Sequence, residues 1–251
     1  MELQKINRPI MRKYLILSFL CFLITACSKS KKEVEDLNTS CFKMSERAYG
    51  NAFRYKKYQD KKALALSFKQ CDSIIYGRCD INSIGSAIDT KLNLYFWTKQ
   101  YKQALDEIEK LKNRDDIFWP AHFPSSTYYK LRLQTFWAND RGEIEERNYY
   151  IKQNIAFMDA CFGAYNGIKY EDTKRNLKEV GLEDAEIHHV KKDYSSLVTY
   201  YSIKSLLYKK EDLLDEIKNI KVEKPLDDYN SLEDYIKNFD TNAYWKVEQL
   251  F

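Results

Sequence analysis

Glycine and proline are scarce in this chain, with 7 and 4 residues among 251. A turn-rich β-sandwich or barrel uses many more of both, and a collagen-like chain or a flexible linker uses more still. No convincing run of alternating apolar and polar residues predicts a strand. Apolar residues nevertheless make up 44% of the sequence, which is enough for a sizeable core. The composition therefore favours one helical domain, or at most two small ones.

Residues that commonly build catalytic sites are also few. The chain has 3 histidines, no Cys-x-x-Cys pair, no nucleophile-elbow serine and no glycine-rich phosphate loop. His188 and His189 are adjacent, and on a helix they would point about 100° apart, which disfavours a shared metal. A metal site with Asp184 or Asp193 stays open, but we interpret this segment as a solvated charged face. We expect no enzyme activity, no metal and no cofactor.

The longest apolar run is Tyr14–Ile24, at eleven residues. A bilayer span needs about 20 residues, so this run is too short to be a comfortable transmembrane helix. Lys5, Arg8, Arg12 and Lys13 precede it, and small or polar residues follow. A basic start, a short apolar middle and a small-residue end are typical of a secretory signal peptide.

The end of this run, Leu23-Ile24-Thr25-Ala26-Cys27, resembles the lipobox of bacterial lipoproteins. The resemblance implies that residues 1–26 are removed as a lipoprotein signal peptide and that Cys27 carries palmitate-type acyl chains. Ser28 follows, where Asp would imply retention at the inner membrane, so the resemblance implies outer-membrane delivery in the bacterial cell envelope. An ordinary signal peptide or an uncleaved anchor is the alternative. A start at Met11 would give the same mature chain, and its orientation toward the periplasm or the outside stays open.

Removal of the signal changes the charge of the chain. The full sequence has 41 basic and 37 acidic side chains, a formal charge of +4. From Cys27 to Phe251 the counts become 37 and 36, a formal charge of +1. This balance does not favour a nucleic-acid partner. Residues 27–40, mostly polar, are expected to form a lipidated tether before the folded body.

From Cys41 onward, apolar residues recur at spacings of three and four, which predicts helices. The clearest pair spans Ile88–Leu111, with a short turn at Thr98-Lys99-Gln100. Amphipathic helices joined by such a turn pack antiparallel. Leu92, Tyr95, Tyr101, Ala104, Ile108 and Leu111 resemble the spaced positions of a tetratricopeptide repeat. In that family the small residue after the turn lets two helices approach closely.

Looser hairpins are predicted over 47–58 with 61–75, 126–137 with 143–158, and 196–208 with 211–220. The first three repeat at about 41 residues, within the range of helical arrays. We therefore predict a single all-α domain over 41–251, made of stacked antiparallel helical hairpins. It is either a TPR-like solenoid or an irregular helical bundle. An irregular insertion is expected at 160–193, with a short helix near 172–180 that Gly181 ends, and a last helix after an Asn230-Ser231 cap.

Four cysteines remain in the body: Cys41, Cys71, Cys79 and Cys161. An oxidising compartment permits disulfides, and four cysteines allow three connectivities. Gly77 can turn the chain back after a helix ending near Tyr76, so Cys71 and Cys79 are the candidate pair. The alternative is that both stay as partly buried thiols.

Aromatic residues are abundant, with 20 Tyr, 13 Phe and 4 Trp. Consecutive aromatics on a helix cannot all face the same core, so one of each pair should be exposed or lie in a groove. Packing between repeats is the alternative explanation. The candidate partner-binding residues are Tyr95, Trp97, Trp119, Trp137, Tyr150 and Tyr201.

Together these features predict a membrane-anchored envelope lipoprotein that acts as a non-catalytic protein–protein interaction module. Its partner is an unknown protein, and its membrane contact is the lipid on Cys27. The two specific alternatives are an immunity lipoprotein that neutralises an incoming toxin and an outer-membrane assembly or scaffold lipoprotein. An enzyme that uses the 160–193 insertion ranks last.

Overall fold

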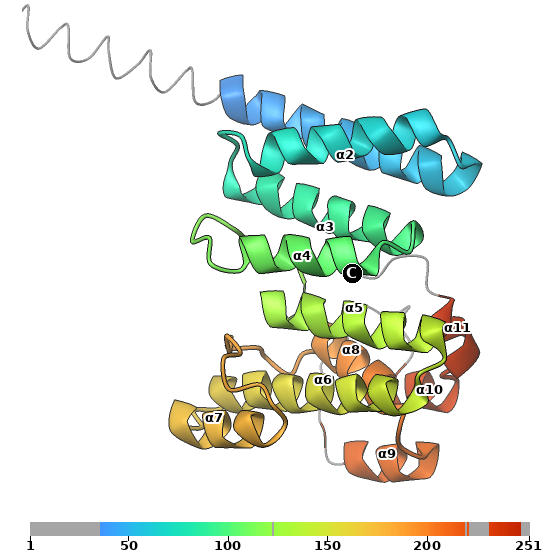
Figure 1. Ribbon diagram of the computed structural model, residues 1–251. Coiled ribbons are helices and arrows are strands. Elements are labelled where there is room, and N and C mark those ends of the chain that lie inside the picture. The colour runs from blue at the N-terminus through green and yellow to red at the C-terminus, as the bar shows by residue number, and fades with distance from the viewer. Residues whose placement is uncertain (1–35, 122, 219, 221–230, 247–251) are drawn as a thin grey trace, which may run out of the picture.

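The structure is a computed structural model and describes residues 36–121, 123–218, 220 and 231–246. Within these ranges the regular elements are helices and none is a strand, which confirms the all-α fold class (Figure 1). The expected signal peptide, residues 1–26, and the expected lipidation site Cys27 lie outside the described residues.

Three helical hairpins stack in chain order. They are helix 36–58 with α2 (Lys61–Ile75), α3 (Ile81–Trp97) with α4 (Tyr101–Leu111), and α5 (Ser126–Arg141) with α6 (Ile144–Tyr165). Figure 1 shows them as successive layers, from blue to yellow. The hairpins lie where the apolar spacing predicts them, although α5 and α6 are both longer than expected.

Caps at the short turns explain where these helices begin and end. The carboxylate of Asp60 accepts hydrogen bonds from the backbone N–H groups of Lys62 (2.9 Å) and Ala63 (3.1 Å) and starts α2. Asp80 starts α3 in the same way. Gly142 ends α5 with a φ of 73°, a left-handed conformation that costs glycine little. Each short turn therefore sets the next helix antiparallel to the last.

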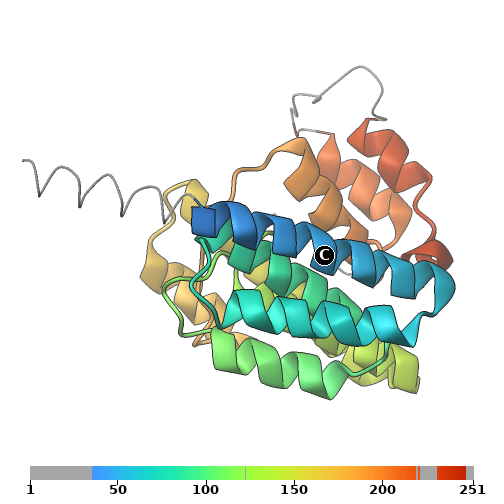
Figure 2. The same cartoon turned by 90° about the horizontal axis from the view of Figure 1, so that it is seen from above.

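The later helices are shorter: α7 (Tyr170–Glu179), α8 (Tyr194–Lys204), α9 (Lys210–Ile217), α10 (Leu232–Lys237) and α11 (Thr241–Trp245). Figure 2 shows the orange and red helices, α8–α11, to one side of the hairpin stack, so they do not add further layers. Ser231 starts α10 with a capping box that includes Asp234, at the predicted cap.

The C-terminal helices share the core of the hairpin stack. One cluster of buried residues extends from Ala48 to Ile236. The ring of Phe136 on α5 lies 5.7 Å from that of Tyr244 and 5.3 Å from that of Trp245, both on α11. Arg132 donates a hydrogen bond from Nη1 to the Tyr244 hydroxyl (3.2 Å). These aromatic contacts hold α11 against the side of α5.

The positions that resemble the tetratricopeptide pattern lie in helix contacts. Leu92, Tyr101, Ala104, Ile108 and Leu111 are buried, and Ala104 has no exposed surface. Tyr95 is half-buried, with its ring 4.9 Å from that of Phe68. The small side chain at 104 thus lies where close packing is expected.

Two expected boundaries differ in the structure. Residues 160–165, placed in the irregular insertion, belong to α6, because Ala160, Cys161 and Phe162 continue its buried face. Only 166–169 and 180–193 lack regular helix, and α7 occupies the space between them. Residues 36–40, placed in the tether, are already helical, since extending an existing helix needs little further stabilisation.

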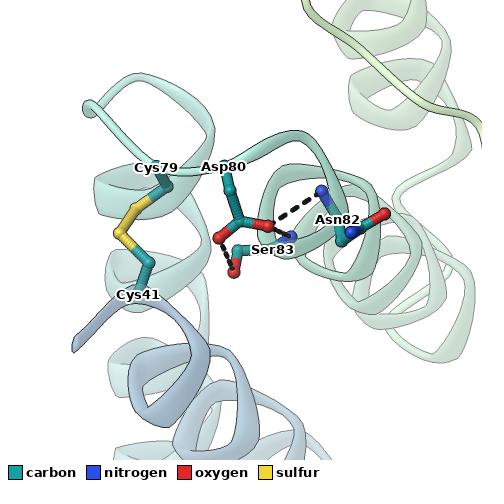
Figure 3. The surroundings of a disulfide bond; sticks show 5 residues. All are labelled: Cys41, Cys79, Asp80, Asn82 and Ser83. Carbon is teal, nitrogen blue, oxygen red and sulfur yellow. Dashed lines mark hydrogen bonds between the residues drawn. A yellow bond between two sulfur atoms is a disulfide. The ribbon is translucent and has the colours of Figure 1, made fainter. Parts of the chain in front are cut away.

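The predicted Cys71–Cys79 disulfide is wrong. The structure pairs Cys41 with Cys79, with a Cα–Cα distance of 5.6 Å (Figure 3). In an antiparallel hairpin the start of the first helix lies beside the end of the second, so Cys41 meets the loop that follows α2. Cys71 is one turn before the end of α2 and faces the core, with no exposed surface. Cys161 is also a buried free thiol.

Candidate protein-binding groove

An open hollow lies where residues 181–186 pass across α4, α5 and α6. It has a volume of about 700 Å³, and the buried side chains of Ile108 and Leu131 supply apolar surface. Tyr149, Tyr150 and Gln153 line it from α6. A second hollow of about 620 Å³ shares Lys112, Asn113 and Glu186 with the first and is also lined by Ile117, Phe118 and Trp119. We call the two hollows together the α4–α6 groove.

The 181–186 wall of the groove is held at both ends. Gln153 on α6 donates hydrogen bonds from Nε2 to the Val180 carbonyl (2.6 Å) and to the Tyr149 hydroxyl (2.9 Å). At the other end, Ser125 donates from Oγ to the Glu186 carbonyl (3.2 Å). Ala185, between these ties, is buried. Hydrogen bonds to Gln153 and Ser125 therefore fix the position of the wall.

Glycine is required where this wall begins. Gly181 has a φ of 74°, which L side chains rarely adopt. A Cβ placed there would lie 3.2 Å from the Tyr149 hydroxyl, closer than most real contacts. The sequence predicts that Gly181 ends a helix. In the structure it also forms the turn between α7 and the groove wall.

The groove is lined by exposed charged side chains of both signs. Glu183, Asp184 and Glu186 are exposed on the wall, and Lys130 on α5 is exposed in the same hollow. Other lining charges are already paired: Lys112 with Glu109, and Arg114 with Asp116 (2.6 Å). Within the described chain, no ion pair engages Glu183, Asp184 or Lys130. An incoming ligand can therefore be bound by both signs.

Of the six aromatic residues predicted to bind a partner, two line the groove. Tyr150 is half-buried and donates a hydrogen bond to Glu146 (3.1 Å). Trp119 lines the second hollow but is only 6% exposed, with its ring 5.1 Å from that of Tyr129. Tyr150 is thus the one of the six that presents an accessible ring in the groove.

The other four lie in contacts between helices and do not gather on one surface. Tyr95 packs on Phe68, as described above, and Trp97 lies under Lys56 (5.3 Å). Trp137 lies between Tyr101 (6.3 Å) and Arg141 (4.4 Å). Tyr201 is buried and donates a hydrogen bond to Glu216 (3.0 Å). These contacts favour packing between helices over a shared binding surface for these four residues.

Sequence reasoning missed part of the groove. Tyr149, which is 50% exposed, and Gln153 line it, yet only Tyr150 of this stretch was a candidate. The Tyr149-Tyr150 doublet was the available signal, since neighbouring helical residues face different sides. After Gly181, the wall residues 182–186 carry no local signal, because their position depends on hydrogen bonds to α6 and to Ser125.

Ion pairs made by buried lysines lie elsewhere and join neighbouring helices. Lys91 on α3 contacts Glu107 (2.5 Å) on α4 and Asp72 (2.7 Å) on α2. Burial alone would lower the pKa of Lys91, but the hydrogen bonds to Asp72 and Glu107 raise this pKa to about 12. Lys204 and Glu216 form a similar pair between α8 and α9. These clusters join helices and do not line the groove.

The histidines do not assemble a site in the described residues. Residues 183–193 are not helical, so Asp184 and His188 do not share a helix face. His188 Nε2 lies 3.4 Å from a Glu186 carboxylate oxygen, and His122 lies outside the described residues. Across the described ranges, no three His, Cys, Asp or Glu side chains are grouped to hold a metal ion.

Comparison with protein-family models, with curated proteins and with solved structures finds no match to this chain. Among the described helices, none is both long and apolar enough to cross a membrane.

Proposed function

We propose that this protein is a membrane-anchored, non-catalytic binding module of the bacterial envelope that holds a segment of a protein partner in the α4–α6 groove. The preformed wall at 181–186 is the observation that carries the proposal. Its ties to Gln153 and Ser125 keep the groove open without a ligand. A preformed site binds with less loss of conformational entropy than one that must order on binding.

The lining of the groove suits a polypeptide segment. Tyr149 and Tyr150 offer accessible aromatic surface, and Leu182 is half-exposed beside them. Tyrosine is enriched among residues that dominate binding energy at protein interfaces. The carboxylates of Glu183 and Asp184 favour a basic residue in the partner next to an apolar one, and Lys130 favours an acidic one further along.

The lipobox-like sequence supports the anchoring part of the proposal. A lipid on Cys27 would hold the module at the membrane, and Ser28 favours the outer membrane. Durable anchoring needs more than one acyl chain, which a lipidated N-terminal cysteine supplies.

The test is an affinity pull-down of the lipidated protein from its own membranes, followed by mass spectrometry. Tyr150→Ala and Asp184→Lys remove an aromatic contact and reverse a charge in the groove. We expect each variant to lose the captured partner several-fold. The matched controls are Tyr165→Ala and Asp106→Lys, which change the same residue types at exposed positions outside the groove.

Equal capture by groove variants and controls would refute the groove as the binding surface. The identity of the captured protein then distinguishes the two specific roles. A toxin would support an immunity lipoprotein, and an envelope-assembly component would support a scaffold lipoprotein.

A further inference from the structure

The first helix exposes an aromatic stripe. Phe42, Tyr49 and Phe53 are 60%, 50% and 51% exposed. Their spacings of seven and four residues place them on one side of the helix. Cys41, Ala48 and Ala52 are buried, and each precedes one of these residues by one position, which is about 100° round the helix. We call Phe42, Tyr49 and Phe53 the aromatic stripe.

This helix is the end layer of the hairpin stack, as Figures 1 and 2 both show. The outer faces of terminal repeats in stacked folds are usually polar, because no further repeat covers them. Large exposed apolar side chains grouped on such a face indicate a contact surface. The Cys41–Cys79 disulfide ties the start of the helix to the loop before α3, so the stripe is fixed to the stack.

The first hairpin also carries a positive excess. Residues 36–75 have eight basic and four acidic side chains, whereas residues 76–251 have 26 basic and 30 acidic ones. The first hairpin therefore has a formal charge of +4, and residues 76–251 have a formal charge of −4. Lys43 and Lys57 are exposed on the first helix, Lys43 next to Phe42 and Lys57 four residues after Phe53, and the Nζ of Lys57 lies 5.2 Å from the centroid of the Tyr58 ring. A surface that is both basic and aromatic is complementary to an anionic bilayer.

The position of the helix in the chain also favours a membrane. Only residues 28–35 separate Cys27 from the described start of the helix, and eight residues span at most about 29 Å when extended. A second copy of the chain is a poorer occupant, because a two-fold contact would bring two positive surfaces together.

We propose that the aromatic stripe, flanked by Lys43 and Lys57, rests on an anionic membrane surface. The first hairpin then faces the bilayer, and the α4–α6 groove lies several layers further along the stack. This inference rests on the membrane association in the proposed function. It adds a second membrane contact, which does not depend on the acyl chains of Cys27 and which orients the module.

The test is hydroxyl-radical footprinting of the lipidated full protein on vesicles. One set of vesicles is pure phosphatidylcholine, and the other contains phosphatidylcholine and phosphatidylglycerol. The acyl anchor inserts into both, so any difference reports docking. We expect several-fold less oxidation of Phe42, Tyr49 and Phe53 on the anionic vesicles. Tyr165, which is 49% exposed at the end of α6, should not change.

Two further measurements identify the cause. The variant Lys43→Glu/Lys57→Glu should lose the protection, and the matched control Lys152→Glu/Lys178→Glu should keep it. The protection should also disappear at about 1 M salt, where the screening length is roughly 3 Å, while flotation with the vesicles persists.

Equal oxidation of the stripe on both vesicle types would overturn the docking proposal, even if the protein floats with them. Protection that depends on protein concentration rather than on phosphatidylglycerol would indicate a second copy and would also overturn it. Failure to float with phosphatidylcholine alone would instead count against the lipid anchor, and failure to bind either vesicle would refute both.

Discussion

Ionisable residues in this core differ in how well their neighbours compensate the cost of burying a charge. Lys91 meets two carboxylates and the ring of Tyr76 (5.6 Å), so its charge is balanced. Asp89, on the same helix, takes part in no ion pair within the described chain and is close to Tyr129 and Asn93 (3.5 Å). Burial raises the pKa of Asp89 to about 6, and the hydrogen bond from Tyr129 offsets only part of this shift.

We therefore expect Asp89→Asn to stabilise the protein at neutral pH. The pKa of Asp89 is higher in the folded state than in the unfolded state, so its ionisation weakens folding as pH rises from about 4 to about 6. Above that range the full cost remains, at about 1–2 kcal/mol after allowance for its partial exposure. Urea unfolding at pH 7 should show the gain, and the two proteins should be nearly equal below pH ~4. A gain that does not depend on pH would contradict this assignment.

Lys91→Met should be strongly destabilising, because Glu107 is buried and would lose its cation. Breaking a buried ion pair from one side costs about 3–5 kcal/mol. Adding Glu107→Leu should restore much of this loss, since no buried charge is then left unpaired and Asp72, whose side chain is 51% exposed, is solvated. Lys102→Met is the control, because it removes an exposed pair with Asp106 worth at most about 1 kcal/mol. Urea unfolding of the wild type and the three variants measures these free energies. Similar losses of stability for Lys91→Met and Lys102→Met would show that the buried pair contributes no more than an exposed one.

At the scale of elements, close approach of helices and the single disulfide among the described cysteines constrain the hairpins. Ala104 is fully buried between helices, where a larger side chain has no room. Ala104→Trp should lower the free energy of unfolding by about 1–3 kcal/mol or more through overpacking. Gln103→Trp places the same ring at the exposed neighbouring position and should change little. An unchanged melting temperature for Ala104→Trp would show that position 104 is not a close helix contact.

The Cys41–Cys79 bond closes the first hairpin onto the second across 38 residues. Chain entropy assigns such a loop roughly 4 kcal/mol of stabilisation. Reduction should therefore lower the melting temperature of the wild type and of Cys71→Ala. It should have no effect on Cys79→Ala, which lacks the bond from the outset. A Cys71→Ala variant that no longer responds to reductant would instead support the pairing first expected from the sequence.

The helices and their turns could be predicted because their signals are local. The spacing of Leu92, Ala104 and Ile108 and the cap at Ser231 need no knowledge of distant residues. The disulfide and the groove could not be predicted in the same way. Cys41 meets Cys79 only because the first helix begins before residue 41, and the groove wall is positioned by Gln153 and Ser125, which are distant in sequence.

At the scale of the whole molecule, the sign of the surface charge changes along the stack of hairpins. The positive excess and the aromatic stripe lie at the N-terminal end of the stack, and the acidic wall of the groove lies further along it. A contact at the first layer would leave the groove accessible. This arrangement has a functional meaning only if the N-terminus is held at a membrane, so the state of Cys27 is the decisive property.

Labelled palmitate should enter the wild-type protein and fail to enter Cys27→Ser. The same substitution should leave residues 1–26 attached, because the lipobox resemblance implies that lipidation precedes cleavage, and intact mass then exceeds that of the wild-type polypeptide. Cys21→Ser is the matched control, since Cys21 lies in the apolar run and would be removed with the proposed signal peptide. It should keep both the label and the cleavage. Label that persists in Cys27→Ser, or that is missing from a wild-type protein with intact Cys27, would remove the anchor on which both the proposed function and the orientation of the stack depend.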